Sequence, residues 1–201
     1  MLLTEYAISV LYFNKSGIKS VRHKNGKSTP NTRNRMTPKI TDTAIISNAN
    51  RLISSCYTMT LATAGDNKPW AAPVYYANIG DCFYFFSSPD ARHIQDALAA
   101  GRAAGAIYAE GGSWQNLRGI QMSGKIDAIS DAGQGSKAVI AYVKKFPLVK
   151  TFFSGVHNLN LNGFMSRFHA TLYCFQPDYI VFMDNGVDFG FRQEIPKDAL
   201  A

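Results

Sequence analysis

Short stretches in which hydrophobic and polar residues alternate, or in which aromatic residues gather, recur along this chain and predict β-strands. The clearest stretches are residues 57–63, 70–77, 81–86, 103–108, 168–175, 179–183 and 187–191. A longer stretch over residues 114–129 also alternates, and Gly119 and Gly124 within it indicate a bulge or a close backbone approach. The pattern therefore predicts seven or eight strands.

Turn residues divide these strands into hairpins. Gly65-Asp66-Asn67-Lys68 predicts a turn between the first two strands, and Asp184-Asn185-Gly186 predicts a tight turn near the end of the chain. Gln176-Pro177-Asp178 is expected to join two further strands. Pro73 has no N–H group to donate, so we expect an edge strand or a bulge at its position.

Apolar residues spaced three and four apart predict helices over residues 43–55, about 90–100 and 134–146, with a further helical turn over 148–153. Gly101 is expected to end the second helix, and Pro147 the third. Residues 158–162 are predicted as a loop and 194–201 as an exposed tail. Because the strands occur as hairpins and the helices are inserted singly, the fold class is mainly β, an antiparallel β-barrel with flanking helices.

The net charge of +7 is confined to the start of the chain. Residues 1–40 contain eight Lys or Arg and one Glu, whereas residues 41–201 contain thirteen residues of each sign. We expect residues 1–40 to form a basic, disordered extension and residues 41–201 to form one domain. Either Met36 is the natural start of the chain, or the extension is a basic arm for an anionic partner. The neutral domain argues against a nucleic-acid-binding fold.

The three cysteines, Cys56, Cys82 and Cys174, lie far apart in apolar sequence and form no CxxC or His/Cys cluster. We therefore expect no zinc site, and three buried thiols in a reducing, cytoplasmic location. The apolar first residues lack the basic region and cleavage site of a signal peptide. No apolar run approaches the roughly 20 residues of a membrane span.

The stretch from Phe83 to Ile94 has the chemistry to bind an anion. Four aromatic residues predict the end of a strand, Ser87 and Ser88 follow, and Arg92-His93 lie in the first turn of the next helix. Free N–H groups at a helix start, together with a guanidinium, suit a phosphate. Alternatively, both serines are N-caps, Arg92 is a solvated charge and His93 caps surface backbone.

In order and spacing, the hairpin over residues 58–77, the stretch over 83–94 and the strand Leu117-Arg118-Gly119-Ile120-Gln121-Met122-Ser123-Gly124-Lys125-Ile126 resemble a known family. This is the family of split-barrel flavin proteins related to pyridoxamine 5′-phosphate oxidase, and the chain is most similar to a branch of small uncharacterised bacterial proteins. The resemblance covers about residues 43–192 and implies an antiparallel split β-barrel. It also implies a homodimer with FMN at the two-fold interface.

The resemblance implies the FMN-binding residues as well. The phosphate would lie at Ser87, Ser88, Arg92 and His93, and the isoalloxazine ring would lie along Ala72, Pro73, Val74 and Tyr75. Arg118 would reach a phosphate across the dimer or be a surface residue. Gln121 would bond the pyrimidine edge of the flavin or simply point outward from an alternating strand.

The chain departs from true pyridoxamine 5′-phosphate oxidases at two places. Their Arg-Gln pair reads Arg118-Gly119 here, and the segment 189–194 lacks their Trp. The resemblance therefore implies an FMN-dependent oxidoreductase acting on another small substrate. We name no catalytic residue and no metal ligand, because the flavin carries the redox chemistry in such proteins.

Two other functions stay open. One is a non-enzymatic flavin or heme carrier or sensor of the same fold, since split barrels also hold deazaflavin or heme; His157 and His169 are then the candidate heme ligands. The other is a barrel that binds nucleic acid through its basic extension.

Overall fold

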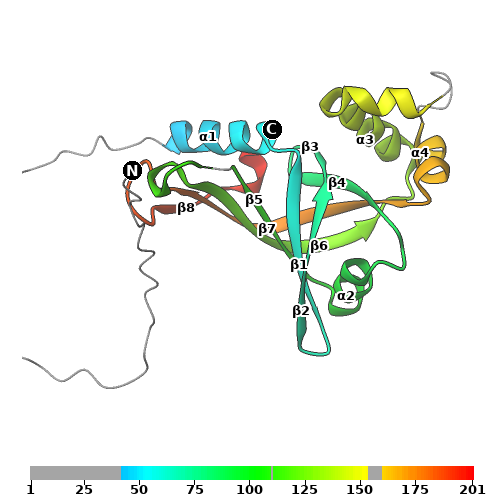
Figure 1. Cartoon of the computed structure of the whole chain (residues 1–201), viewed down its shortest axis with the longest axis horizontal. Coiled ribbons are helices and arrows are strands. Elements are labelled where there is room, and N and C mark those ends of the chain that lie inside the picture. The colour runs from blue at the N-terminus through cyan, green and yellow to red at the C-terminus, as the bar shows by residue number, and fades with distance from the viewer. Residues whose placement is uncertain (1–41, 110, 154–159) are drawn as a thin grey trace, which may run out of the picture. The chain divides into compact units, whose positions relative to one another are not determined.

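The strands of the computed structural model build one antiparallel sheet (Figure 1). The structure describes residues 42–109, 111–153 and 160–201, so the predicted basic extension over 1–40 lies outside the described residues. The sheet order is β2-β1-β5-β6-β7-β4-β3, and β8 pairs with β7. The strands are β1 (Thr58–Gly65), β2 (Lys68–Tyr75), β3 (Ala77–Ile79), β4 (Cys82–Ser87), β5 (Ala103–Tyr108), β6 (Arg118–Ala128), β7 (Thr171–Asp184) and β8 (Arg192–Glu194).

The connection between β2 and β3 shows that this sheet is strongly curled. The two strands stand at opposite ends of the strand order, yet Tyr76 alone separates them along the chain. Tyr76 N donates to Tyr57 O at 3.2 Å, which holds the connection between β2 and β3 against the start of β1. The fold is therefore an antiparallel split β-barrel, as predicted. Pro73 lies on the edge strand β2, as its missing N–H group requires.

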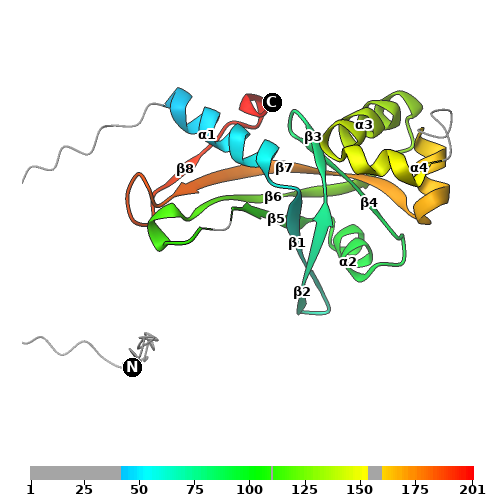
Figure 2. The same ribbon diagram turned by 45° about the horizontal axis from the view of Figure 1, so that its top comes forward.

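Four α-helices flank the described sheet: α1 (Asp42–Ser55), α2 (Arg92–Ala100), α3 (Ala132–Lys145) and α4 (Leu161–Phe168). Short 3-10 helices follow β5, α3 and β8, namely η1 (Trp114–Asn116), η2 (Pro147–Phe152) and η4 (Lys197–Ala199). Figure 2 shows α1 lying across the sheet, while α3 and α4 gather at its other end. Among the described residues, no helix has the length and apolar character needed to cross a membrane.

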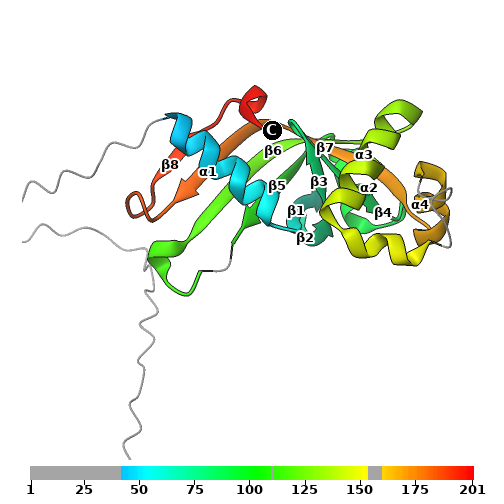
Figure 3. The same ribbon diagram turned by 90° about the horizontal axis from the view of Figure 1, so that it is seen from above.

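The barrel strands bury side chains on two faces. Phe83 and Phe85 of β4 pack inside the barrel, with α1 and α2 covering its openings. Cys82 and Tyr84 alternate with them and pack outside the barrel, under Tyr142 of α3. Figure 3, seen from above, shows α3 and α4 over this part of the sheet. Because β4 is buried on both faces, its sequence is a continuous aromatic run rather than an alternating one.

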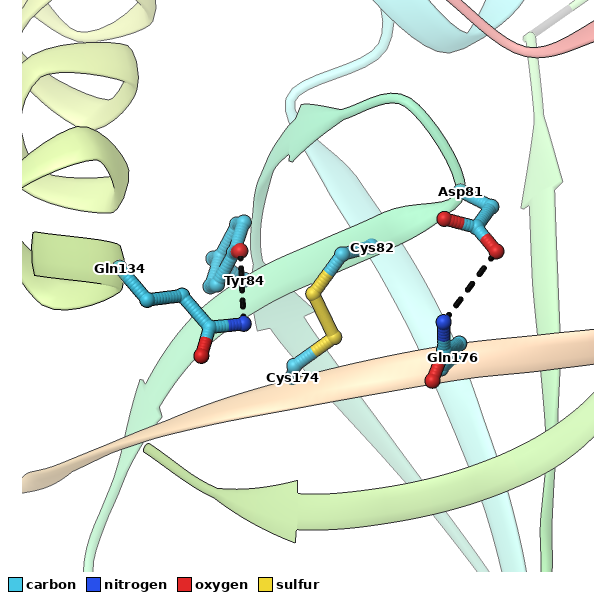
Figure 4. Close-up of a disulfide and its surroundings, with 6 residues drawn as sticks. All are labelled: Asp81, Cys82, Tyr84, Gln134, Cys174 and Gln176. Carbon is cyan, nitrogen blue, oxygen red and sulfur yellow. Dashed lines mark hydrogen bonds between the residues drawn. A yellow bond between two sulfur atoms is a disulfide. The ribbon is translucent and has the colours of Figure 1, made fainter. Parts of the chain in front are cut away.

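A disulfide joins Cys82 of β4 to Cys174 of β7 in the core outside the barrel, under α3, with the two Cα atoms 5.7 Å apart (Figure 4). The expectation of three free thiols was wrong for this pair, because the sequence did not reveal that β4 and β7 are neighbours. Cys56 is the free cysteine of the described chain. Beside the disulfide, Gln134 Nε2 donates to Tyr84 Oη at 3.1 Å and ties α3 to the sheet.

The C-terminal third of the chain differs most from the predicted elements. The two strands predicted over 168–175 and 179–183 form the single strand β7. Part of the predicted loop over 158–162 belongs to helix α4, whose N-cap Asn160 accepts from Gly163 N at 2.9 Å. The predicted strand over 187–191 is a turn region, and β8 begins at Arg192. The predicted exposed tail buries Ile195 and Leu200 against the barrel core.

The long stretch over 114–129 contains both a helical turn and a strand. Its first residues form η1, and Arg118 then begins β6. The register between β6 and β7 shifts between Ser123 and Gly124, which confirms the predicted bulge. A Cβ atom on Gly124 would lie 2.2 Å from Gln176 O, so the close backbone approach requires glycine.

Candidate functional site

The segment between β4 and α2 leaves a helix start without a side-chain cap. Ala91 stands at the N-cap of α2 and makes no side-chain hydrogen bond, whereas Asp131 and Asn160 cap α3 and α4. Neither serine caps α2, because Ser88 Oγ accepts from Asp90 N at 3.3 Å and Ser87 Oγ bonds His93. The first N–H groups of a helix have no acceptor within it, so this end of α2 can receive an anion.

His93 links the helix start to the end of β4. Its Nε2 lies 3.0 Å from Ser87 Oγ. The ring is half-buried, and burial lowers the pKa of His93, which favours the neutral imidazole. His93 therefore holds together the corner formed by residues 87–93 and offers it a hydrogen-bonding group, while its neighbour Arg92 supplies the positive charge.

Arg92 lies between α2 and the β1–β2 hairpin. Its Nε lies 3.3 Å from Asp96 Oδ2 and its Nη2 donates to Lys68 O at 3.1 Å. The guanidinium carbon lies 4.6 Å from the centroid of the Trp70 ring. The Arg92 side chain is 42% exposed and that of Asp96 15%, so this is a partly exposed ion pair whose guanidinium an anion can still reach from the solvent. A ligand role for Arg92 stays a prediction.

The four predicted ring-binding residues on β2 divide between the two faces of the strand. The side chains of Ala72 and Val74 point into the barrel and are buried. Those of Pro73 and Tyr75 point outward and are exposed. A ligand along this strand would therefore meet the backbone of Ala72 and Val74 and the outer side chains of the other two.

The outer face of the sheet carries mostly small side chains on β2, β1 and β5, and larger ones on β6 and β7. Two rows cross five strands in register: Pro73, Thr60, Ala106, Gln121 and Val181 form one, and Ala71, Ala62, Ala104, Ser123 and Tyr179 form the other. Gln121 is exposed on this face, so the structure brings it into the same row as Pro73, three strands away. A hollow of about 340 Å³ adjoins this face at Thr60, Pro73 and Ala106.

Arg118 lies away from this corner and has a partner inside the chain. Its Nε lies 3.0 Å from Oδ2 of Asp184, a carboxylate that is 2% exposed. Asp184 Oδ1 also accepts from Gly186 N at 2.8 Å. Arg92 contacts Lys68, in the end of the β1–β2 hairpin that lies beyond the row of Ser123, and five residues of strand, about 17 Å, separate Ser123 from Arg118. One chain therefore does not bring Arg118 and the start of α2 together.

Sequence reasoning missed the groups that hold Arg92. The spacing of Arg92 and Asp96, one helical turn apart, could have predicted their ion pair. The stacking of the Arg92 guanidinium on Trp70 depends on tertiary structure, so no local sequence pattern predicted it. Of the two candidate heme ligands, His169 is exposed at the C-cap of α4, and His157 lies outside the described residues.

The fold and this corner define the class of protein as a split barrel with an open helix start at its rim. The family model for pyridoxamine 5′-phosphate oxidase matches residues 45–151, which is just over half of the chain. The chain therefore belongs to the pyridoxamine 5′-phosphate oxidase family. Among proteins with curated descriptions, none matches the chain.

Solved structures support the same fold. The chain is similar to a heme binding protein from Mycobacterium smegmatis, with a TM-score of 0.60 and 16% identity over 80% of this chain and 61% of that one. It is similar to the conserved hypothetical protein Rv2991 from Mycobacterium tuberculosis, with a TM-score of 0.56 and 14% identity over 78% of this chain and 92% of that one. The chain is also similar to a FAD-binding protein from Mesorhizobium loti, with a TM-score of 0.50 and 16% identity over 67% of this chain and 90% of that one.

Proposed function

We propose that this protein binds FMN and acts as an oxidoreductase on a small organic substrate. The observation that carries the proposal is the uncapped start of α2 with Arg92 beside it. Family membership adds support, because the predicted phosphate segment lies within the matched residues 45–151. Bound FMN would supply the electron transfer, and the chain would supply binding and orientation.

The residues of the corner divide the binding between them. The N–H groups at the start of α2 and the guanidinium of Arg92 would hold the phosphate, with the guanidinium giving up its partly exposed pair with Asp96. His93 would add a further hydrogen-bonding group beside the phosphate. The ring would lie along the outer face of β2, where Ala71 and Pro73 leave room.

A homodimer fits this proposal. The members of the two rows on β2, β1 and β5 are small and leave this part of the sheet face open, and such a face can pack closely against another surface. A second copy on this face would cover the flavin ring and could contribute Gln121 or Arg118. Without a second copy, Arg118 and the start of α2 lie toward opposite ends of the strands.

The test is FMN retention by the purified full-length chain and two arginine variants. We expect the chain to retain FMN through gel filtration, with its visible absorption, and Arg92→Ala to weaken binding roughly tenfold or more, because a hydrogen bond to a charged group contributes about 1.5–3 kcal/mol. Arg51→Ala is the matched control, since Arg51 is an exposed arginine that bonds Asn48 within α1. Equal FMN affinity of both variants would defeat the proposal.

The alternative is a non-enzymatic flavin or heme protein. It is favoured by the heme binding protein among the similar structures. Reduced nicotinamides added to the FMN-loaded protein without oxygen distinguish the two: bleaching of the flavin supports an oxidoreductase, and an unchanged spectrum supports a carrier or sensor. Retention of hemin with a Soret band, and no retention of FMN, would assign the site to heme.

A further inference from the structure

A second, larger cavity lies outside the barrel, between the edge of β2 and the helices α3 and α4. Its volume is about 840 Å³, within the size range of small-molecule sites. Of its thirteen lining residues within the described chain, eight are aromatic and Lys145 is the one charged residue. These described walls therefore combine apolar side chains with one cation.

The walls of this cavity are packed rings that hold their positions without a ligand. The Phe86 ring stacks on Phe164 with centroids 5.2 Å apart, and Phe146 contacts the rings of Tyr142 at 5.3 Å and Tyr75 at 5.6 Å. Phe164 and Tyr142 are buried at the base. The Tyr142 hydroxyl donates to Tyr75 O and so joins α3 to β2 across the cavity. Preformed aromatic walls favour a flat apolar ligand.

Lys145 gives the cavity one positive group. Its Nζ donates to Ile53 O at 3.2 Å and lies 3.6 Å from the centroid of the Tyr76 ring. Burial lowers the pKa of Lys145 to about 8, so the amine is still mostly protonated at pH 7. An ammonium has three N–H donors, and these two contacts leave one for an anionic oxygen. One donor suits a carboxylate better than a phosphate, because a phosphate has more charge and more oxygens to satisfy.

We propose that this cavity binds a planar aromatic molecule carrying one carboxylate, with its ring between the aromatic walls and its carboxylate at Lys145. The binding site itself does not depend on the flavin. Its interpretation as the substrate site rests on the proposed function, because Tyr75 belongs both to the cavity wall and to the predicted flavin strand.

The test compares three naphthalene probes on the full-length protein by calorimetry: 2-naphthoate, the neutral 2-naphthalenemethanol and 2-naphthyl phosphate. We expect 2-naphthoate to bind most tightly. Lys145→Met should weaken 2-naphthoate about tenfold and leave the alcohol unchanged, because the variant keeps the length of the side chain and removes the charge. Lys145→Arg should keep the preference for 2-naphthoate, which shows that loss in the first variant reflects charge and not misfolding.

Two phenylalanines provide a matched pair for the walls. Phe152 is 52% exposed at the cavity rim and contacts Phe168, with ring centroids 6.1 Å apart. Phe189 is 77% exposed and contacts Trp114 at 5.5 Å, away from the cavity. We expect Phe152→Ala to weaken both 2-naphthoate and the alcohol severalfold, and Phe189→Ala to weaken neither.

Four results would overturn the inference: no naphthoate binding, equal weakening of acid and alcohol by Lys145→Met, tightest binding of naphthyl phosphate, or equal effects of the two phenylalanine variants. Conversion of a dimer to a monomer by Phe152→Ala would also overturn it, because the cavity would then be a subunit interface. Naphthoate binding in a protein that never retains FMN would defeat the proposed function alone. FMN retention without naphthoate binding would defeat this inference alone.

Discussion

Replacing Arg118 by alanine should destabilise the fold more than replacing Arg92 by alanine, although the family resemblance makes both arginines candidate flavin ligands. The reason lies in their carboxylate partners. Asp184, the partner of Arg118, is 2% exposed. Asp96, the partner of Arg92, stands one helical turn away, is 15% exposed and keeps the Thr63 hydroxyl, 3.4 Å away, as a second partner. Loss of Arg118 leaves a buried carboxylate with Gly186 N as its remaining neutral donor.

The expected magnitudes follow from this difference in burial. A hydrogen bond to a charged group contributes about 1.5–3 kcal/mol, and an unpaired buried charge adds to the loss. Because the Arg118 side chain is itself 50% exposed, we expect Arg118→Ala to cost about 2–3 kcal/mol rather than the full cost of breaking a completely buried pair. The Arg92 pair and its contact with Trp70 are partly exposed, so Arg92→Ala should cost about 1 kcal/mol or less.

Urea unfolding followed by far-UV circular dichroism measures both changes. With a denaturant slope near 2 kcal/mol/M, the midpoint should fall by about 1–1.5 M for Arg118→Ala and by about 0.5 M or less for Arg92→Ala. Tryptophan fluorescence is unsuitable, because Trp70 lies under Arg92. Adding Asp184→Asn to Arg118→Ala should recover part of the loss, since it removes the unpaired buried charge. Equal midpoints for the two arginine variants would refute the argument from burial.

Two further predictions concern single residues. Burial lowers the pKa of Lys145 to about 8 against about 10.4 in an unfolded chain, so the unfolded state binds more protons between these values and the stability contribution of Lys145 should rise with pH across that window. Lys145→Met should remove this rise and, after allowance for the partial exposure of the amine, stabilise the fold by about 1 kcal/mol at pH 7. Urea midpoints of both proteins at pH 7 and pH 9.5 test this. Cys56 and Tyr76, which lie beside the amine, are the same in both proteins and so do not account for a difference between them. Gly124→Ala should cost about 1–3 kcal/mol in the same assay, because its Cβ would meet Gln176 O at 2.2 Å. Gly112→Ala, whose Cβ would meet no atom of the described residues within 4 Å, should stay within about 0.5 kcal/mol. A drop in stability at Gly112 equal to that at Gly124 would show that backbone crowding is not the cause.

Local patterns predicted most of the fold because its early elements follow local rules. The turn over 65–68 needs residues that accept a positive φ, and Asp66 and Asn67 adopt φ of 51° and 59°. Gly101 ends α2 with a φ of 66°. The errors fall where tertiary contacts decide. Pro177 lies inside β7 opposite the bulge at Gly124, so a residue that predicts a turn is accommodated within one strand.

The candidate site was less predictable, because pairing across the sheet sets it. The motif around Phe83–Ile94 indicated an anion site, and the structure does form a helix start there. Nothing in the local sequence placed Gln121 in the row of Pro73, or gave Arg118 a partner 66 residues away in Asp184. The aromatic cavity was also hidden, because its walls come from the start of β1 and from β2, β4, α3, η2 and α4.

Tyr75 is the residue at which the two proposed sites meet. Its ring is exposed beside Pro73 on the outer face of β2 and packs edge-on against Phe146 of the cavity wall. Its carbonyl oxygen accepts the hydroxyl proton of Tyr142, whose pKa is raised by burial, so this donor keeps its proton at physiological pH. The hydrogen bond fixes α3 relative to β2, and a molecule in the cavity would therefore lie beside the strand proposed to hold the flavin ring. If the flavin lies along β2 as proposed, the aromatic cavity with Lys145 lies beside its ring, and an unphosphorylated carboxylate would fit that cavity better than a phosphate ester.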